Sequence, residues 1–313
     1  MARSPVAISA SLSLVLACAL WGVATVISKQ LLTSVPPITL LVLQLSTSVV
    51  VLWALTLASG LRSVSRRKLV PIALIGVLNP GLSYTLSMLG LAHTTASVAT
   101  LLWAAEPAMI IVLAWLLLRE VITFRLLALT ATASCGVVLV SGLLGKADLA
   151  ADSELGVALI LGGVACCALY TVLSRKIAID IDPLLTVTVQ QTAGLLWALS
   201  IWRIELKGSA LEAVLAMTTS VLAGAMLTGL MYYALAFWLY LSGLRRVPAS
   251  TAGLFLNLTP AFGVAVAYVW LGERLTQMQW IGAGIILISV LALLTHNGAE
   301  TQPPLTQLPN PER

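Results

Sequence analysis

The sequence predicts an all-α integral membrane protein with ten transmembrane helices, arranged as two inverted five-helix repeats. Three observations lead to this fold class. Hydrophobic residues make up 59% of the chain and charged residues only 9%, the apolar residues form long continuous runs, and the second half repeats features of the first. A soluble domain carries about 25% charged residues, so this chain has too much apolar surface to face water.

The apolar runs have the length that a bilayer requires, which is about 20 residues for one helix. The predicted spans cover residues 7–28, 37–59, 69–91, 96–118, 124–144, 155–174, 183–202, 218–242, 249–271 and 277–295. The first run continues well past Cys18 and is longer than the core of a signal peptide, so we expect an uncleaved first helix.

Basic residues are spread unevenly over the expected loops. The N-terminus, the even-numbered loops and the C-terminal tail hold most of the 17 Lys and Arg residues. A cluster formed by Arg62, Arg66, Arg67 and Lys68 contributes most to this difference. By the positive-inside rule, both termini are cytoplasmic. We expect a multi-pass protein of the inner (plasma) membrane. The net charge of +5 therefore requires no nucleic-acid partner.

A polar stretch divides the chain into two halves. We expect a first repeat over residues 1–144, which holds spans one to five, and a linker over residues 145–154. A second repeat over residues 155–295 holds spans six to ten, and residues 296–313 form a polar, proline-rich tail that we expect to be disordered.

The two halves match at constant sequence offsets. An offset of 153 residues relates the later spans of each half, and an offset of 146 residues relates the earlier ones. Because five is odd, the second copy enters the membrane in the opposite orientation. Inverted repeats are a construction of secondary transporters, in which the site lies near the midplane between the halves. The matched positions include Gly76 with Gly229, Gly90 with Gly243, Ser97 with Ser250, Pro107 with Pro260, Glu120 with Glu273, Ser28 with Ser174 and Gln44 with Gln190.

The order and duplication of these motifs resemble the drug/metabolite transporter superfamily, and specifically its EamA-type ten-helix members. The resemblance covers residues 7–295. It implies efflux or exchange of small metabolites, often amino acids or their relatives, without indicating one substrate. The first half departs from the family pattern at Arg119, where a glycine is common. The motifs are Trp21-Gly22, Glu106-Pro107 followed by Leu118-Arg119-Glu120, and Thr259-Pro260 followed by Leu271-Gly272-Glu273-Arg274-Leu275.

Glu106 lies near the centre of the fourth predicted span and is followed by Pro107. A charged side chain at this depth costs about 2.5–3.5 kcal/mol on insertion scales, and intramembrane acids usually face a cavity or a partner. We expect Glu106 to line a functional cavity; the alternative is a structural glutamate that is protonated or hydrogen-bonded between helices. Since a low dielectric disfavours charge, a neutral Glu106 could exchange a proton for substrate, which makes protons a candidate coupling ion. A charged Glu106 could instead bind a substrate ammonium group.

Further polar and aromatic side chains lie near mid-span. Aromatic faces and amides suit a small organic substrate, although helix–helix hydrogen bonding explains any single one of them about as well. Three prolines each remove a backbone donor near a span centre, which predicts hinges or packing kinks at Pro80, Pro107 and Pro260. The predicted substrate-binding residues are Glu106, Trp103, Asn79, Trp21, Thr25, Tyr170, Tyr232, Tyr233 and Asn257.

The sequence lacks the parts of an enzyme site. It has no P-loop, no HExxH and no GxSxG motif, and its two histidines, His93 and His296, lie near span ends. We therefore expect no catalytic residue, metal or cofactor, and we interpret the four cysteines as packing residues. We expect Glu120 and Glu273 to fix the short turns between spans. The partners are a small-molecule substrate and the lipid bilayer, and the oligomeric state is not predicted. The alternative function is a membrane sensor or assembly subunit, which would need a longer soluble segment than any loop here.

Overall fold

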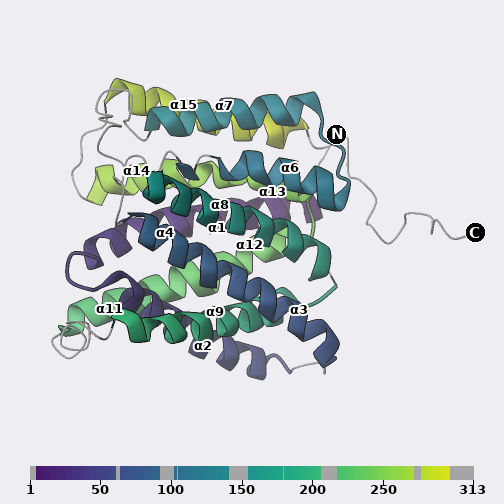
Figure 1. The fold of residues 1–313 in the computed structure, drawn as a ribbon. Helices are drawn as coiled ribbons and strands as arrows, with labels where there is room; N and C mark the ends of the chain where they lie inside the picture. The colour runs from purple at the N-terminus through teal and green to yellow at the C-terminus, as the bar shows by residue number, and fades with distance from the viewer. Residues whose placement is uncertain are drawn as a thin grey trace, which may run out of the picture.

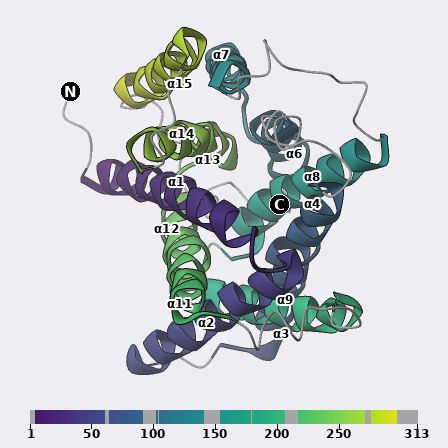
Figure 2. The ribbon, with the colours of Figure 1, turned by 90° about the vertical axis from the view of Figure 1, so that its left-hand side faces the viewer.

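The computed structural model describes residues 5–60, 64–91, 102–103, 105–140, 154–178, 180–205, 217–270 and 276–296. Within these ranges the chain is helical, as predicted, and contains no strand. The helices lie roughly along one direction, and α7 and α15 form a pair outside the others (Figures 1 and 2). Residues 96–101 of the fourth predicted span, linker residues 145–153, residues 271–275 of the motif and tail residues 297–313 lie outside the described ranges.

The predicted spans correspond to single helices or to helices with an internal break. In the first half the elements are α1 (Pro5–Leu31), α2 (Pro37–Ala58), α3 (Arg66–Gly76), η1 (Val77–Leu82), α4 (Ser83–Leu91), α6 (Glu106–Leu118) and α7 (Phe124–Val140). In the second half they are α8 (Glu154–Ile177), α9 (Pro183–Glu205), α11 (Thr219–Thr228), η4 (Gly229–Ala236), α12 (Phe237–Leu244), α13 (Ala249–Leu256), α14 (Leu258–Trp270) and α15 (Gln277–His296). The π-helical segments η1 and η4 interrupt the third and eighth predicted spans.

Six helical stretches in the described ranges are long and apolar enough to cross a bilayer. Three shorter apolar helices accompany them, at Glu106–Leu118, Phe124–Leu139 and Gln277–Leu293. Large apolar side chains such as Leu55, Trp115 and Ile288 are exposed on the outer faces. Such a surface suits lipid, in which helices satisfy their own backbone hydrogen bonds. The chain is therefore a multi-pass membrane protein. The six long stretches are Ser9–Ser28, Pro37–Ala58, Arg66–Ser87, Glu154–Ile177, Pro183–Arg203 and Thr219–Leu244.

Close glycine contacts join the two halves at matched positions. A Cβ atom added at Gly229 would lie 2.5 Å from the main-chain oxygen of Gln44, and Gly76 makes the corresponding close contact with the main-chain oxygen of Gln190. The two glycines are 153 residues apart and the two glutamines are 146 residues apart, which are the two offsets of the internal repeat. Small residues allow helix backbones to approach this closely in membranes, so η4 packs on α2 as η1 packs on α9.

A second matched pair of contacts involves Gly90 and Gly243. A Cβ atom at Gly90 would lie 2.9 Å from the oxygen of Gly156, and one at Gly243 would lie 3.0 Å from the oxygen of Ala10. The same two offsets relate these positions. Consequently α4 packs on α8 in the same way as α12 packs on α1.

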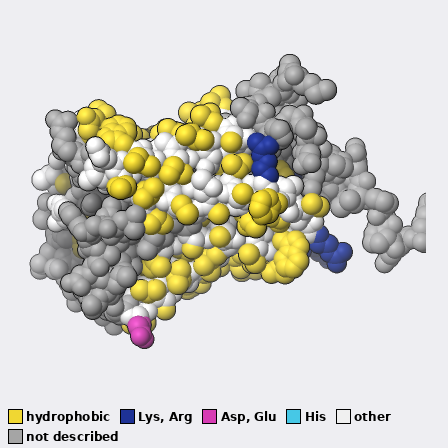
Figure 3. Space-filling view, turned by 90° about the horizontal axis from the view of Figure 1, so that it is seen from above, with side chains coloured by type: hydrophobic (Ala, Val, Ile, Leu, Met, Phe, Trp, Pro, Cys, Tyr) yellow, Lys and Arg dark blue, Asp and Glu magenta, His cyan; other side chains and the backbone are white. Residues whose placement is uncertain are grey.

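Basic side chains gather at one end of the helices, which we call the basic end. Arg246 Nη1 donates to Ser9 Oγ at 2.6 Å, and Lys176 Nζ lies 3.5 Å from the Leu117 oxygen, so the start of α1 meets the ends of α6, α8 and α12 there. Figure 3 shows Lys and Arg side chains toward this end and an acidic side chain toward the opposite one. The basic end carries Arg66, Arg67, Lys68, Arg119, Arg125, Arg175, Lys176, Arg245 and Arg246.

Candidate functional site

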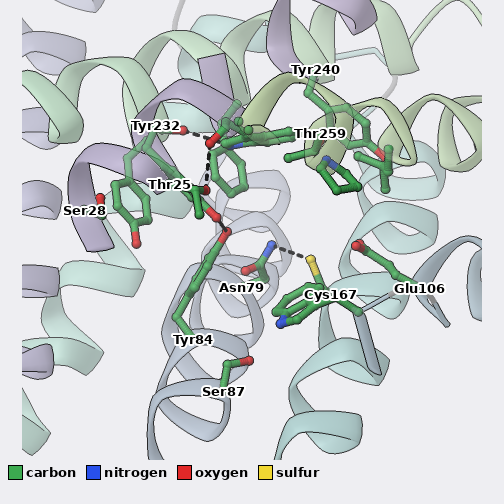
Figure 4. A pocket seen from close by; sticks show the side chains of 18 of the residues that line it. Thr25, Ser28, Asn79, Tyr84, Ser87, Glu106, Cys167, Tyr232, Tyr240 and Thr259 are labelled. Atoms are coloured by element: carbon green, nitrogen blue, oxygen red, sulfur yellow. Dashed lines mark hydrogen bonds between the residues drawn. The ribbon is translucent and has the colours of Figure 1, made fainter. Parts of the chain in front are cut away.

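A cavity of about 480 Å³ lies between the two halves. Its volume falls within the range of about 300–1,000 Å³ that is typical of small-molecule sites. The lining comes from α1, α2, η1, α4, α6, α7, α8, η4, α12, α13 and α14, together with Trp103 and Asn257 (Figure 4). No single helix could enclose this space, so the site depends on the contacts between the halves.

Every side chain that the sequence predicts for substrate binding lines this cavity. Pro107 and Pro260 line it as well, in the first turns of α6 and α14. Pro80 does not appear in the lining; its ring packs against Gly194 of α9. The predicted residues in the lining are Glu106, Trp103, Asn79, Trp21, Thr25, Tyr170, Tyr232, Tyr233 and Asn257.

The helices break where they reach the cavity. Asn79 has non-helical backbone angles (φ −149°, ψ 121°) in η1, just before Pro80. Asn257 separates α13 from α14, and its amide nitrogen donates to the Leu254 oxygen at 3.1 Å. The Cys18 thiol donates to the Phe255 oxygen at 3.2 Å. These side chains satisfy carbonyl groups near the break, which an apolar environment would otherwise leave unpaired.

Glu106 is the first residue of α6 and is only 8% exposed. Its side chain lies beside the Cys167 thiol of α8. Asn79 Nδ2 also reaches Cys167, with a distance of 3.5 Å between nitrogen and sulfur. Asn79 Oδ1 is buried and has no hydrogen-bond partner in the described part of the chain. Cys167 therefore connects Glu106 to Asn79, which our interpretation of the cysteines as packing residues did not anticipate.

Aromatic rings form a continuous wall of the cavity, in contact with one another from α1, α4, α8, η4 and α12. The Tyr232 ring lies 5.8 Å from that of Tyr84 and 4.8 Å from that of Tyr233, between ring centroids. The Tyr84 hydroxyl donates to the Tyr232 hydroxyl at 2.9 Å, and Trp21 Nε1 donates to the Tyr232 main-chain oxygen at 3.1 Å. These bonds fix the ring planes. The wall consists of Trp21, Tyr84, Tyr170, Tyr232, Tyr233, Phe237 and Tyr240.

Three members of this wall, Tyr84, Phe237 and Tyr240, are not among the predicted substrate-binding residues. Phe237 and Tyr240 follow Tyr233 by four and seven residues, a spacing that places residues on one helix face, so it could have found both. The spacing gives no such signal for Tyr84, because the residue four positions before it, Pro80, packs against α9 and not into the cavity. The sequence could not show that Cys167 lies beside Glu106, because that contact joins two helices distant in the chain.

The chemistry of the lining suits an organic ligand. Glu106 is the one acidic or basic side chain in the described lining, apart from the phenols and the thiol. No group of three potential metal ligands lies together in the described ranges. The arrangement can place one carboxyl group against an otherwise apolar and aromatic ligand.

Comparison with known proteins gives a consistent result. A model of the EamA-like transporter family matches residues 8–142 and, again, residues 154–295. A probable terminal-alkyne amino-acid exporter from Streptantibioticus cattleyicolor is 27% identical over 270 residues, which cover 83% of this chain and 87% of that protein. The uncharacterized transporter YetK of Bacillus subtilis is 27% identical over 204 residues; the match spans 63% of this chain and 59% of YetK. A solved structure described as "Crystal structure of protein" is similar with a TM-score of 0.76 at 18% identity, covering 94% of this chain and all of that one, which indicates a shared fold.

Proposed function

The chain belongs to the EamA-like transporter family, and from this premise we propose that it is a secondary transporter of small metabolites. Its substrates are amino acids or related compounds, and it works by alternating access around the central cavity. The observation that carries the proposal is the cavity itself, which is enclosed by both halves of the chain and contains a buried carboxyl group. Export is the direction that we favour, because one relative is named a probable exporter.

The proposal includes ten transmembrane helices in two inverted repeats, over residues 1–144 and 155–295. The two family matches, at residues 8–142 and 154–295, support this division. The matched contacts of Gly76 with Gln190 and of Gly229 with Gln44 support it further. Two inverted halves can exchange conformations, so that a cavity open on one side has an equivalent state that is open on the other.

The present state is open away from the basic end. Ser28, Leu32, Pro37, Ser87 and Ile160 line the cavity, and they lie toward the α1–α2 turn, the end of α4 and the start of α8. The helix ends that meet at the basic end contribute nothing to the described lining. With the basic end in the cytoplasm, as the positive-inside rule favours, this is an outward-open state in which both termini are cytoplasmic.

The experiment that tests the function is counterflow into proteoliposomes loaded with a panel of amino acids and related amines, with and without an imposed pH gradient. We expect saturable flux that Glu106→Gln reduces by at least tenfold. Glu154→Gln is the matched control, because Glu154 is exposed and lies outside the cavity. Dependence on the gradient would identify protons as the coupling ion. Equal flux through Glu106→Gln and wild type would contradict a role for Glu106 in transport.

A further inference from the structure

The cavity has an uneven distribution of charge. Glu106 contributes a carboxyl group, and the described lining contains no Lys, Arg or His that would balance it. The buried Asn79 Oδ1 accepts no hydrogen bond from the described part of the chain. Glu106 also lies at the N-terminus of α6, where the helix dipole favours a negative charge. The polar part of this site therefore favours a ligand that donates hydrogen bonds and carries positive charge.

The aromatic wall complements this carboxyl group. Figure 4 shows Glu106 and Cys167 on one side of the site, with Tyr84 and Tyr232 displaced to the other side. Aromatic faces bury apolar groups, and they attract a nearby cation through the negative face of the ring. A ligand that extends from Glu106 to the wall would thus present a cationic group at one end and an apolar or aromatic body at the other.

We propose that the cavity recognises a primary ammonium group attached to a compact apolar or aromatic body, and that a carboxylate on the ligand is not required. This inference rests on the proposed function and names its substrate class. A buried charge needs a partner of opposite sign. An ammonium group finds that partner in Glu106, whereas a ligand carboxylate would approach Glu106 with like charge.

A matched series of four ligands tests this inference, because the four share a phenyl body and differ in the charged group. They are 2-phenylethylamine, phenylalanine, 3-phenylpropionate and 2-phenylethanol. Their equilibrium binding to the purified full chain in detergent is measured at one pH and ionic strength. We expect the amine to bind at least tenfold more tightly than the alcohol and the anion, with phenylalanine between the amine and the anion.

Variants of Glu106 identify the group that is responsible. Glu106→Gln should remove the preference for the amine over the alcohol, Glu106→Asp should keep it, and Glu154→Gln should leave all four affinities unchanged. The inference is overturned if the anion or the alcohol binds as tightly as the amine, if the amine shows no saturable binding, or if a folded Glu106→Gln chain keeps the preference. Binding needs no flux, so a chain that binds the amine but shows no counterflow would contradict the transporter proposal and not this one.

Discussion

Glu120 and Ser250 join the two halves of the chain through hydrogen bonds at the basic end. Glu120 Oε2 accepts from the Ser250 hydroxyl at 2.6 Å and from the Ser250 backbone nitrogen at 3.1 Å, while Oε1 accepts from the Ala249 nitrogen at 2.8 Å. The carboxylate thereby caps the N-terminus of α13 and is only 9% exposed. Our interpretation of Glu120 as a residue that fixes a local turn was incomplete.

We predict that Glu120→Ala opens the basic end. The change leaves two buried backbone donors without an acceptor, at about 1–3 kcal/mol each. If the closed state of the basic end loses about 3 kcal/mol in total, the equilibrium between its closed and open states shifts toward the open state by roughly 100-fold. The native Cys167, which lines the cavity, is the reporter in a chain that carries Cys18→Ser, Cys135→Ser and Cys166→Ser. An impermeant maleimide should label Cys167 faster from the basic side in the variant.

Two comparisons make that labelling result specific. Ser250→Ala removes one of the three hydrogen bonds and should raise the labelling rate by a smaller factor. Glu154→Ala removes an exposed carboxylate and should have no effect. Labelling of Glu120→Ala at the wild-type rate from both sides would show that the Glu120 cap does not close this end.

The contact between Gly229 and Gln44 predicts a steric effect on stability. Gly229→Ala and Gly76→Ala each place a Cβ atom against a helix backbone, and overpacking of this kind costs about 1–3 kcal/mol. Gly284→Ala is the matched control, since a Cβ atom there would meet nothing within 4 Å. Thermal unfolding in detergent should show lower midpoints for the first two variants and no loss for the third. A loss in only one of the matched pair would argue against equivalent contacts in the two halves.

Tyr84 is predicted to act through its ring and not through its hydroxyl. Tyr84→Phe removes the hydrogen bond to Tyr232 but keeps the ring, so affinity for 2-phenylethylamine should fall by less than about threefold. Tyr84→Leu removes the aromatic face, and the loss of about 0.5–2 kcal/mol corresponds to roughly 2- to 30-fold weaker binding. Tyr268→Leu is the control, because Tyr268 packs on Trp280 outside the cavity. Weaker binding by Tyr268→Leu would indicate a general loss of structure.

The sequence predicted the membrane class and nine of the side chains that line the cavity, because both depend on local pattern. Apolar runs give the helices, and polar residues near mid-span can be read from helical spacing. Contacts between distant helices could not be read in this way. Glu120 meets Ser250 across 130 residues of sequence, and Cys167 meets Asn79 across 88. The sequence predicted kinks from Pro80 and Pro260 near these positions, but not the helix breaks at Asn79 and Asn257 themselves. The geometry of a break depends on the neighbouring helices that satisfy the freed carbonyl groups, and the local sequence does not show those helices.

The orientation of the chain can be tested with reporter fusions. We expect alkaline phosphatase to be active when fused after Ser34, in the α1–α2 turn, and inactive when fused after Arg246 at the basic end. The physical reason is the retention of Lys- and Arg-rich loops in the cytoplasm. A cytoplasmic fluorescent reporter at the same two sites should give the opposite pattern. Activity after Arg246 would invert the orientation and make the present state inward-open.

Arg119 predicts a stabilising substitution. It ends α6 with φ 55° and ψ 33°, in the left-handed region where a side chain with a Cβ atom costs about 1–2 kcal/mol. Glycine adopts this region without that cost, which is the physical reason that a glycine suits this position of the motif. Glycine also loses more backbone entropy on folding, so we expect Arg119→Gly to raise the free energy of unfolding by only about 0.5–1 kcal/mol.

Arg119→Ala separates the loss of the charge from the relief of backbone strain, because it removes the charge but keeps the Cβ atom. Thermal unfolding should therefore give a higher midpoint for Arg119→Gly than for Arg119→Ala, and equal midpoints would mean that the left-handed turn is not strained.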